Sequence, residues 1–225
     1  TRPIPDIGVQ LLRDKGYEVL VNEAVGNRAA DKSEILRGIK DVDAVLSILT
    51  DKIDAEIMDA GLPTLKMIAN YAVGFDNIDV EAARQRNIMV ANTPGVLTDT
   101  VAEHTFALML AISHRIVEAD KFTRAGRYTA WGPKLLLGDD LSGKTLGIIG
   151  LGRIGSRVAG HGVKGFGMKV LYNDIKPDGE FERQFGAVFV GSVDGLLPQA
   201  DYVSLHVPLL DSTRHLLNEE RLKLM

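Results

Sequence analysis

The sequence contains no cysteine, a single tryptophan and only eight prolines among its 225 residues. Without cysteine the chain can form neither a disulfide nor a thiolate metal site, and a cysteine nucleophile is excluded. No apolar run approaches the length of a membrane span, and the first residues lack the apolar and charged pattern of a targeting peptide. These absences favour a cytoplasmic protein with no membrane partner and no metal site.

An excess of positive charge is also missing. Lysine and arginine total 26 against 30 for aspartate and glutamate, which leaves a net charge of -4. Proteins that bind a phosphate backbone normally carry a basic surface, so nucleic acid is not an expected partner. With 45% hydrophobic and 25% charged residues, the composition is that of a folded globular chain, and its length favours two domains.

Amphipathic and apolar segments alternate in the first part of the chain. The periodicity predicts helices over 6–15 and 31–40, and strands over 17–21, 44–49, 65–69 and 88–91. Parallel strands need crossover connections, which helices supply, so this alternation predicts an α/β fold with a parallel sheet. Because the chain opens on a helix rather than a strand, we expect that an initial strand is missing.

Turn-forming residues at 92–95 interrupt this pattern and predict a domain boundary. A single helix is predicted from about Thr98 to Glu118. Apolar residues cover most of its circumference, so we expect it to be buried on several sides, either as an interior helix or as one that also packs against a second subunit. A second β/α series follows, with strands at 145–149, 169–173, 187–190 and 202–207, a helix from about Arg153 and a last helix at 218–225.

The strand at 145–149 runs into a Gly-x-Gly-x-x-Gly turn formed by Gly150, Gly152 and Gly155. Gly150 suits the tight turn, Gly152 lets a pyrophosphate approach the backbone, and Gly155 lets the helix pack closely on the strand. The free N–H groups and the positive end of the helix dipole would then meet the phosphates. Alone the spacing is weak evidence, because methyltransferases carry similar glycine-rich turns.

An acidic residue strengthens the dinucleotide interpretation. Asp174 ends the next predicted strand, 19 positions after Gly155, where its carboxylate can accept hydrogen bonds from ribose hydroxyls. It would also repel a ribose 2′-phosphate, so the sequence favours NAD over NADP. The alternative is a solvated carboxylate at a strand end.

Several segments resemble the D-2-hydroxyacid dehydrogenases, the group that includes glyoxylate/hydroxypyruvate reductases, phosphoglycerate dehydrogenases and formate dehydrogenases. The most specific segments are 70–79, 92–95 with 101–104, 143–155 and 206–209. The resemblance implies two Rossmann-like or flavodoxin-like domains with parallel sheets, truncated at both ends. Residues 1–92 would be the substrate-binding (catalytic) domain without its first strand, and 93–225 the NAD-binding Rossmann domain without its C-terminal part.

The resemblance also implies roles for individual residues. In the family the loop matching 72–74 presents backbone N–H groups to the substrate carboxylate, which assigns substrate binding to Val73 and Gly74. A loop of this kind can form an anion-binding nest without any side chain. The alternative is a plain strand-to-helix turn with Asp76 or Asn77 as the helix cap. The implied cofactor contacts are Val73, Gly150, Gly152, Arg153, Ile154, Gly155, Asp174, His206, Val207 and Pro208.

His206 is interpreted as a contact that shapes the adenosine side, not as the catalytic histidine. The segment 128–134 is most similar to the glyoxylate/hydroxypyruvate reductases, in which a tryptophan at this place reaches the substrate pocket of the other subunit. Trp131 has that role or anchors an ordinary subunit interface.

The implied reaction is reversible hydride transfer between NAD(H) and a small 2-oxo or 2-hydroxy acid such as glyoxylate or hydroxypyruvate, in a homodimer. The family's catalytic arginine, glutamate and histidine would lie after Met225, so no catalytic residue is assigned and we expect no turnover from this polypeptide alone. Two alternatives remain. One is a phosphoglycerate dehydrogenase, which would need basic residues near the substrate loop for a phosphate, although none stands beside Val73 and Gly74 in the sequence. The other is a non-enzymatic NAD-sensing protein like the C-terminal-binding-protein corepressors.

Overall fold

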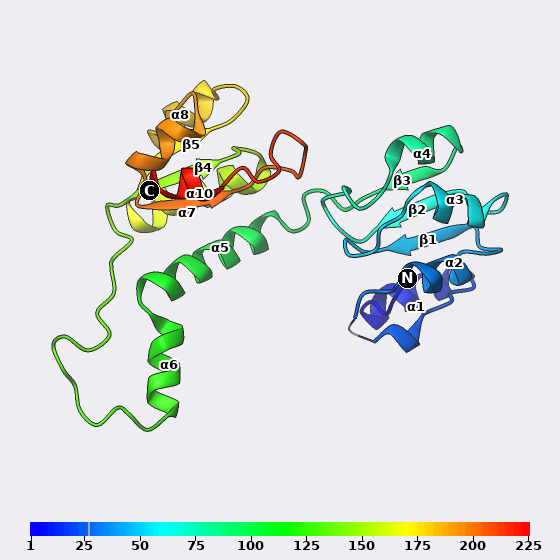
Figure 1. The fold of residues 1–225 in the computed structure, drawn as a ribbon, viewed down its shortest axis with the longest axis horizontal. Coiled ribbons are helices and arrows are strands. Elements are labelled where there is room, and N and C mark those ends of the chain that lie inside the picture. Colours follow the sequence, from blue (N-terminus) through cyan, green and yellow to red (C-terminus); the bar gives the residue numbers. More distant parts are fainter. Residues whose placement is uncertain (27) are drawn as a thin grey trace. The chain divides into compact units, whose positions relative to one another are not determined.

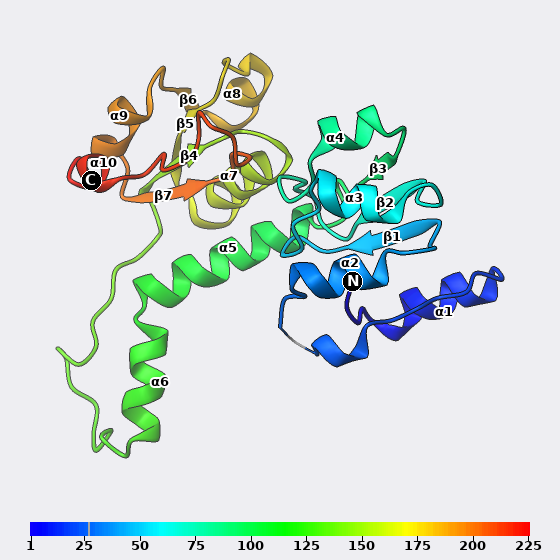
Figure 2. The same cartoon turned by 45° about the vertical axis from the view of Figure 1, so that its right-hand side comes forward.

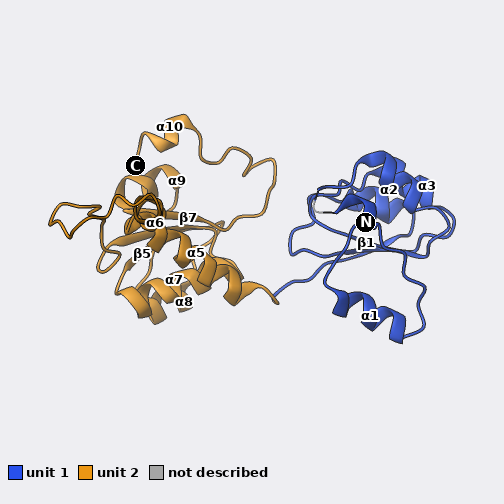
Figure 3. Cartoon of the chain, turned by 90° about the horizontal axis from the view of Figure 1, so that it is seen from below, with its two compact units in different colours: residues 1–95 blue, residues 96–225 orange. Residues whose placement is uncertain are grey.

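The computed structural model describes residues 1–26 and 28–225, which divide into two compact units (Figure 3). Unit 1 comprises residues 1–95 and unit 2 residues 96–225. Each unit contains its own parallel sheet, as the β/α alternation predicted. Within the described residues, no helix is long and apolar enough to cross a membrane.

Unit 1 is built on a three-stranded parallel sheet in the order β1-β2-β3. The strands are β1 (Ala44–Ser47), β2 (Met67–Asn70) and β3 (Met89–Ala91), and the helical segments are α1 (Asp6–Asp14), η1 (Glu23–Val25), α2 (Lys32–Gly38), α3 (Ala55–Gly61) and α4 (Val80–Gln85). Figure 3 shows α2 and α3 on one side of the sheet and α1 on the other. Fully buried Ile53, Ile57 and Ile68 belong to a core that the sheet forms with α2, α3 and α4.

Aspartates set the starts of three helices in unit 1. Asp31 forms a capping box with Glu34 at α2, and Asp54 and Asp79 accept hydrogen bonds from the third amide of α3 and α4. Such caps satisfy amides that have no partner inside the helix, and each stabilises by about 1 kcal/mol. The cap of α4 is therefore Asp79, and neither Asp76 nor Asn77 fills this position.

The predicted strand at 17–21 does not form. This segment has no regular structure and pairs with no strand of the sheet, and Tyr17 and Leu20 are 64% and 73% exposed. An apolar, β-prone segment becomes a strand only where a neighbouring backbone satisfies its N–H and C=O groups. Periodicity reports the local preference and carries no information on that partner.

Unit 2 is built on a four-stranded parallel sheet in the order β6-β5-β4-β7. The strands are β4 (Thr145–Ile149), β5 (Lys169–Asn173), β6 (Val188–Phe189) and β7 (Tyr202–Leu205). The helical segments that accompany them are α7 (Arg153–Phe166), α8 (Gly179–Phe185), α9 (Val193–Leu196), η2 (Leu197–Gln199) and α10 (Glu219–Leu222). All of these elements match predicted ones except α8, α9 and η2.

The central strand β4 buries both of its faces. Leu146 and Ile148 pack into the cluster that contains buried residues of α7, whereas Ile149 packs with Leu196 of α9. At Gly147 the approach of α9 is so close that a Cβ would lie 2.6 Å from the Leu196 side chain. A strand covered on both faces is expected to be apolar throughout rather than alternating, as this one is.

The long helix predicted from Thr98 to Glu118 is two helices, α5 (Thr98–Ser113) and α6 (Ile116–Arg124). Arg115 separates them in the left-handed conformation, with φ of 52°. In the described chain α5 buries one face, and Ile112 on its other side is 75% exposed, so the helix is not an interior one. Packing of its exposed side against a second subunit stays a prediction. The apolar periodicity of a helix does not reveal a single left-handed residue, because this conformation is set by the dihedral angles of that one residue.

Helix α6 and residues 125–137 form an arm that leaves the body of unit 2 (Figures 1 and 2). None of the residues of α6 is buried. The end of the arm is fixed at Gly138, because Asp139 donates its N–H to the Ser113 carbonyl at 2.9 Å and a Cβ at Gly138 would lie 2.1 Å from that oxygen. The arm therefore starts and ends at the last turn of α5.

Candidate functional site

Two of the three glycines in the turn after β4 are required by packing. Gly150 has φ of +95°, donates its N–H to the Asn173 carbonyl at 2.8 Å, and would place a Cβ 2.8 Å from the carbonyl carbon of His206. A Cβ on Gly155 would lie 2.0 Å from the Gly150 carbonyl oxygen. Neither position can hold a side chain without moving the backbone.

Gly152 differs from its two neighbours. Its φ and ψ of -72° and -164° suit any residue, and a Cβ would meet no protein atom within 4 Å. The fold does not require glycine here, and the space in front of α7 is open. This open space allows a ligand to approach the backbone closely, as the dinucleotide interpretation of the turn predicts.

The N-terminus of α7 offers its amides to such a ligand. No side chain caps the helix, and no acidic residue lies in its first turn. Arg153 is exposed at the first position, and Ile154 packs into the core behind it. Uncapped amides, the helix dipole and a nearby guanidinium together favour a phosphate group.

Asp174 holds the glycine turn in place. Its Oδ2 accepts the Leu151 N–H at 2.6 Å and its Oδ1 accepts the Ile175 N–H at 2.6 Å. Each carboxylate oxygen can accept more than one hydrogen bond, so hydroxyl groups of a ligand can still bind. The carboxylate thus connects the turn after β4 with the end of β5 and presents a negative charge beside the α7 terminus.

His206 follows β7 on the other side of the turn. Its N–H donates to the Ile149 carbonyl at 2.8 Å, and its Nε2 lies 2.9 Å from the Ser204 hydroxyl. Burial lowers the pKa of the imidazole below its usual value, so the ring is neutral at pH 7. Val207 packs against the core and Pro208 is exposed.

The predicted residues of unit 2 therefore meet at one edge of the sheet. The glycine turn, Asp174 and His206 follow the carboxyl ends of β4, β5 and β7. The connections from β4 lead through β5 and β6 and return to β7 on the opposite side of β4, so the chain order reverses between β4 and β7. In open parallel sheets, ligands bind beside the carboxyl ends of the strands at this reversal point.

Unit 1 contains the loop predicted to bind the substrate carboxylate. All three carbonyls of residues 72–74 accept hydrogen bonds: Ala72 from the Thr93 N–H at 2.9 Å, Val73 from Asn92 Nδ2 at 2.8 Å, and Gly74 from Asn70 Nδ2 at 2.8 Å. The amides of Val73 and Gly74 donate to no atom of residues 1–26 or 28–225. The loop thus has bound carbonyls and available amides.

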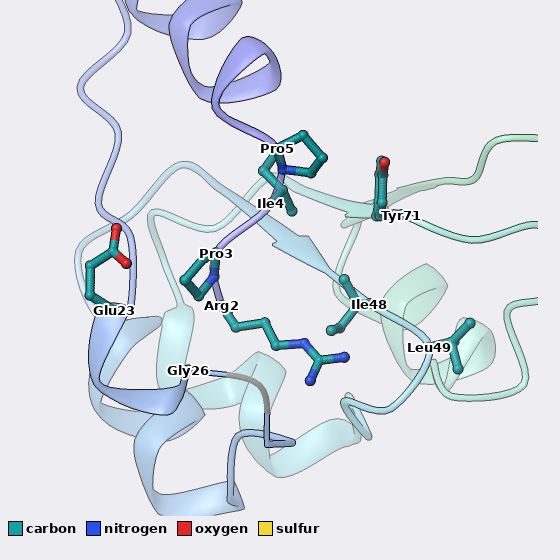
Figure 4. Close-up of a pocket in the computed structure, with 9 residues that line it drawn as sticks. All are labelled: Arg2, Pro3, Ile4, Pro5, Glu23, Gly26, Ile48, Leu49 and Tyr71. Atoms are coloured by element: carbon teal, nitrogen blue, oxygen red, sulfur yellow. The ribbon is translucent and has the colours of Figure 1, made fainter. Parts of the chain in front are cut away.

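An open cavity of about 580 Å³ lies in unit 1, beside the residue that precedes this loop. Ile48 and Tyr71, at the carboxyl ends of β1 and β2, face the segment 2–5 across it (Figure 4). Arg2 also lines the cavity and donates to the Arg28 carbonyl at 2.9 Å. The sequence shows no basic residue beside the loop, because only the fold places Arg2 and Tyr71 on the lining of one cavity.

Trp131 is 78% exposed on the arm of unit 2. Among the described residues, no group of three or more histidine, aspartate or glutamate side chains could hold a metal ion.

Residues 106–225 match the NAD binding domain of the D-isomer specific 2-hydroxyacid dehydrogenases. A glyoxylate reductase of Korarchaeum cryptofilum is 46% identical over the whole chain, and one of Thermofilum pendens is 48% identical. A solved D-lactate dehydrogenase of Aquifex aeolicus, in complex with NAD and lactic acid, matches 99% of the chain and 64% of its own length, with a TM-score of 0.83 and 33% identity.

The chain belongs to the D-2-hydroxyacid dehydrogenase family, as the resemblance of its motifs predicted. Its two units are α/β folds with parallel sheets, and the second unit contains the family's NAD-binding domain. The chain spans about two thirds of the length of the curated relatives it matches, 66% for each of the two reductases.

The two kinds of glycine predict opposite outcomes of substitution. Gly152→Ala should weaken NADH binding by at least about tenfold, since its methyl group enters the open space before α7, and should change the free energy of unfolding by less than about 1 kcal/mol. Gly155→Ala should instead destabilise the protein by about 1–3 kcal/mol or more. NADH fluorescence titration and chemical unfolding measure both effects. Unchanged NADH affinity in Gly152→Ala would contradict the assignment.

Proposed function

We propose that the protein carrying this chain is a cytoplasmic oxidoreductase that transfers a hydride between NAD(H) and a small 2-oxo or 2-hydroxy acid, with glyoxylate or hydroxypyruvate as substrate. The observation that carries the proposal is the open, uncapped N-terminus of α7 behind Gly152, with the Asp174 carboxylate fixed beside it. The match to glyoxylate reductases over the whole chain supports the substrate class.

In unit 2 the residues divide the recognition of NAD among them. The nicotinamide of the bound cofactor supplies or accepts the hydride. The amides of Gly152, Arg153 and Ile154, at the start of α7, bind the pyrophosphate. The Asp174 carboxylate accepts hydrogen bonds from the ribose hydroxyls. His206, Val207 and Pro208 shape the adenosine side, and the neutral His206 ring places no charge there.

In unit 1 the amides of Val73 and Gly74 bind the carboxylate of the acid, and Val73 also contacts the cofactor. Two adjacent N–H groups can hold one anion and orient the 2-carbon that accepts the hydride. No side-chain charge is needed for this contact. Trp131 completes the substrate pocket of a partner subunit or anchors the interface between subunits.

One observation favours a second candidate. A phosphoglycerate dehydrogenase needs a cation for its substrate's phosphate, and the fold brings Arg2 into the cavity beside Tyr71. The Arg2 guanidinium already donates to the Arg28 carbonyl, which lowers its capacity to bind a phosphate. We therefore rank the glyoxylate or hydroxypyruvate reductase first. No contact of the described residues favours the NAD-sensing corepressor.

The proposed reaction predicts NADH oxidation that depends on the added acid. A protein that contains this chain and has the full length of its relatives should oxidise NADH with glyoxylate or hydroxypyruvate. It should do so more slowly with phosphohydroxypyruvate. Nicotinamide absorbance measures the rate. A preference for phosphohydroxypyruvate would support the second candidate, and NADH binding without turnover on any of the three acids would contradict the enzyme.

The carboxylate of Asp174 should determine the choice of dinucleotide. Asp174→Ser should lower the preference for NADH over NADPH by about tenfold, because it removes the charge that repels a 2′-phosphate. Both affinities should also fall somewhat, since the bond to the Leu151 amide is lost. Fluorescence titration with each dinucleotide measures the ratio of the two Kd values.

Asp201→Ser is the matched control. Like Asp174, Asp201 accepts a backbone N–H, that of Thr145 at 2.8 Å, but this bond lies at the opposite end of β4. It should leave the ratio unchanged. An unaltered ratio in Asp174→Ser would remove the ribose assignment.

We also propose a homodimer that forms through α5 and the arm. Leu108, Ile112, Ile116, Val117 and Trp131 are each at least half exposed on these elements. Exposed apolar side chains on α5 and on the arm that follows it favour a subunit interface. Ile112→Glu should convert the dimer to a monomer in light scattering, because a dimer would bury the new charge, whereas Ile175→Glu should not. A wild-type monomer at micromolar concentration would contradict the proposal.

A further inference from the structure

We infer that Asn92 and Asn70 are positioning residues. They bind carbonyl groups of the 72–74 loop and thereby direct the amides of Gly74 and Phe75 at the substrate carboxylate. The inference rests on the proposed function, which places the carboxylate at these amides. It extends that function to two side chains that need not touch the substrate.

The geometry of the peptide bond connects each side chain to one amide. In a planar trans peptide, the C=O of one residue and the N–H of the next point in opposite directions. Asn92 Nδ2 holds the Val73 carbonyl at 2.8 Å and thereby orients the N–H of Gly74. Asn70 Nδ2 holds the Gly74 carbonyl at 2.8 Å and orients the N–H of Phe75.

The backbone orients the remaining amide in the same way. The Thr93 N–H holds the Ala72 carbonyl at 2.9 Å, and this bond orients the N–H of Val73. The consecutive amides of residues 73–75 donate to no atom of the part of the chain that the structure describes. Three successive carbonyls are bound, and the amides that follow them have no acceptor among the described residues, which leaves these amides available to an anion.

Asn70 is itself fixed by a buried network. It is 2% exposed, its Oδ1 accepts the Ser47 hydroxyl at 2.9 Å, and its Nδ2 donates to Asn77 Oδ1 at 3.0 Å. Asn77 in turn donates to the carbonyls of Ile48 and Asp51. The partners determine which way the Asn70 amide points, because the reverse orientation would set its oxygen against the Gly74 carbonyl. Satisfied buried networks of this kind are rigid.

Asn92 is the more direct probe of the two. It follows β3 and is half-buried. Among the described residues, its side chain makes one hydrogen bond, to the Val73 carbonyl. Its removal leaves the buried network of Asn70 intact. The loss should therefore act on the direction of the Gly74 amide rather than on the fold of unit 1.

The test observes the amides themselves in ¹⁵N-labelled protein, with oxamate as a carboxylate probe and sodium chloride as the ionic-strength control. In the wild type, the Val73 and Gly74 resonances should shift on titration with oxamate. In Asn92→Ala, the Gly74 shift should be lost or strongly reduced and the Kd for oxamate should rise by about tenfold, as expected for the loss of one oriented bond to a charged group. Asn218→Ala, which removes the cap of α10, should behave as the wild type.

A kinetic measurement separates positioning from general damage. In the full-length enzyme, Asn92→Ala should raise the KM for glyoxylate by about tenfold and leave the Kd for NADH unchanged, because NADH binds mainly to unit 2. Asn70→Ala should show a larger effect, and where it unfolds the protein, Asn92→Ala alone decides the question.

The outcomes distinguish the inference from the proposed function. Wild-type protein in which oxamate shifts neither Val73 nor Gly74 would overturn both the carboxylate site and the positioning role. Wild-type shifts that persist with the same Kd in Asn92→Ala would overturn the positioning role alone. Equal loss of oxamate and NADH binding in Asn92→Ala would also overturn it, since that result indicates damage to the fold.

Discussion

An unpaired backbone N–H at the end of a parallel strand is the group on which both candidate sites depend. A buried or oriented amide without a protein acceptor carries a partial positive charge, and an anion can satisfy it at no cost in side-chain entropy. In unit 2 these amides lie at the start of α7, and in unit 1 they lie in the loop after β2. The rest of each unit positions them.

In each unit, hydrogen bonds from neighbouring elements hold the segment that carries these amides. In unit 2 the Asp174 carboxylate binds the Leu151 N–H and holds the glycine turn against β5. In unit 1 Asn70 and Asn92 hold the carbonyls of Gly74 and Val73 in the loop after β2. Preorganised N–H groups of this kind need not reorient when the anion arrives, which is why they bind and orient ligands effectively.

The glycine turn contains positions of different origin, which its sequence spacing cannot separate. A Cβ at Gly150 or Gly155 would clash with the protein backbone, whereas a Cβ at Gly152 would meet open space. Packing requires the first two glycines, whereas the open space at Gly152 leaves room for a ligand to approach the backbone.

The sequence alone was sufficient for the α/β class, most strands of both sheets, the glycine turn and the family, because these features depend on local periodicity and on short contiguous motifs. The segment 17–21 and the helix from Thr98 to Glu118 were predicted incorrectly, since strand pairing and a left-handed Arg115 depend on partners and dihedral angles that periodicity does not contain. Only the tertiary structure could place Arg2 and Tyr71 on one cavity, or bring Asn92 to the Val73 carbonyl, because these residues lie far apart along the chain.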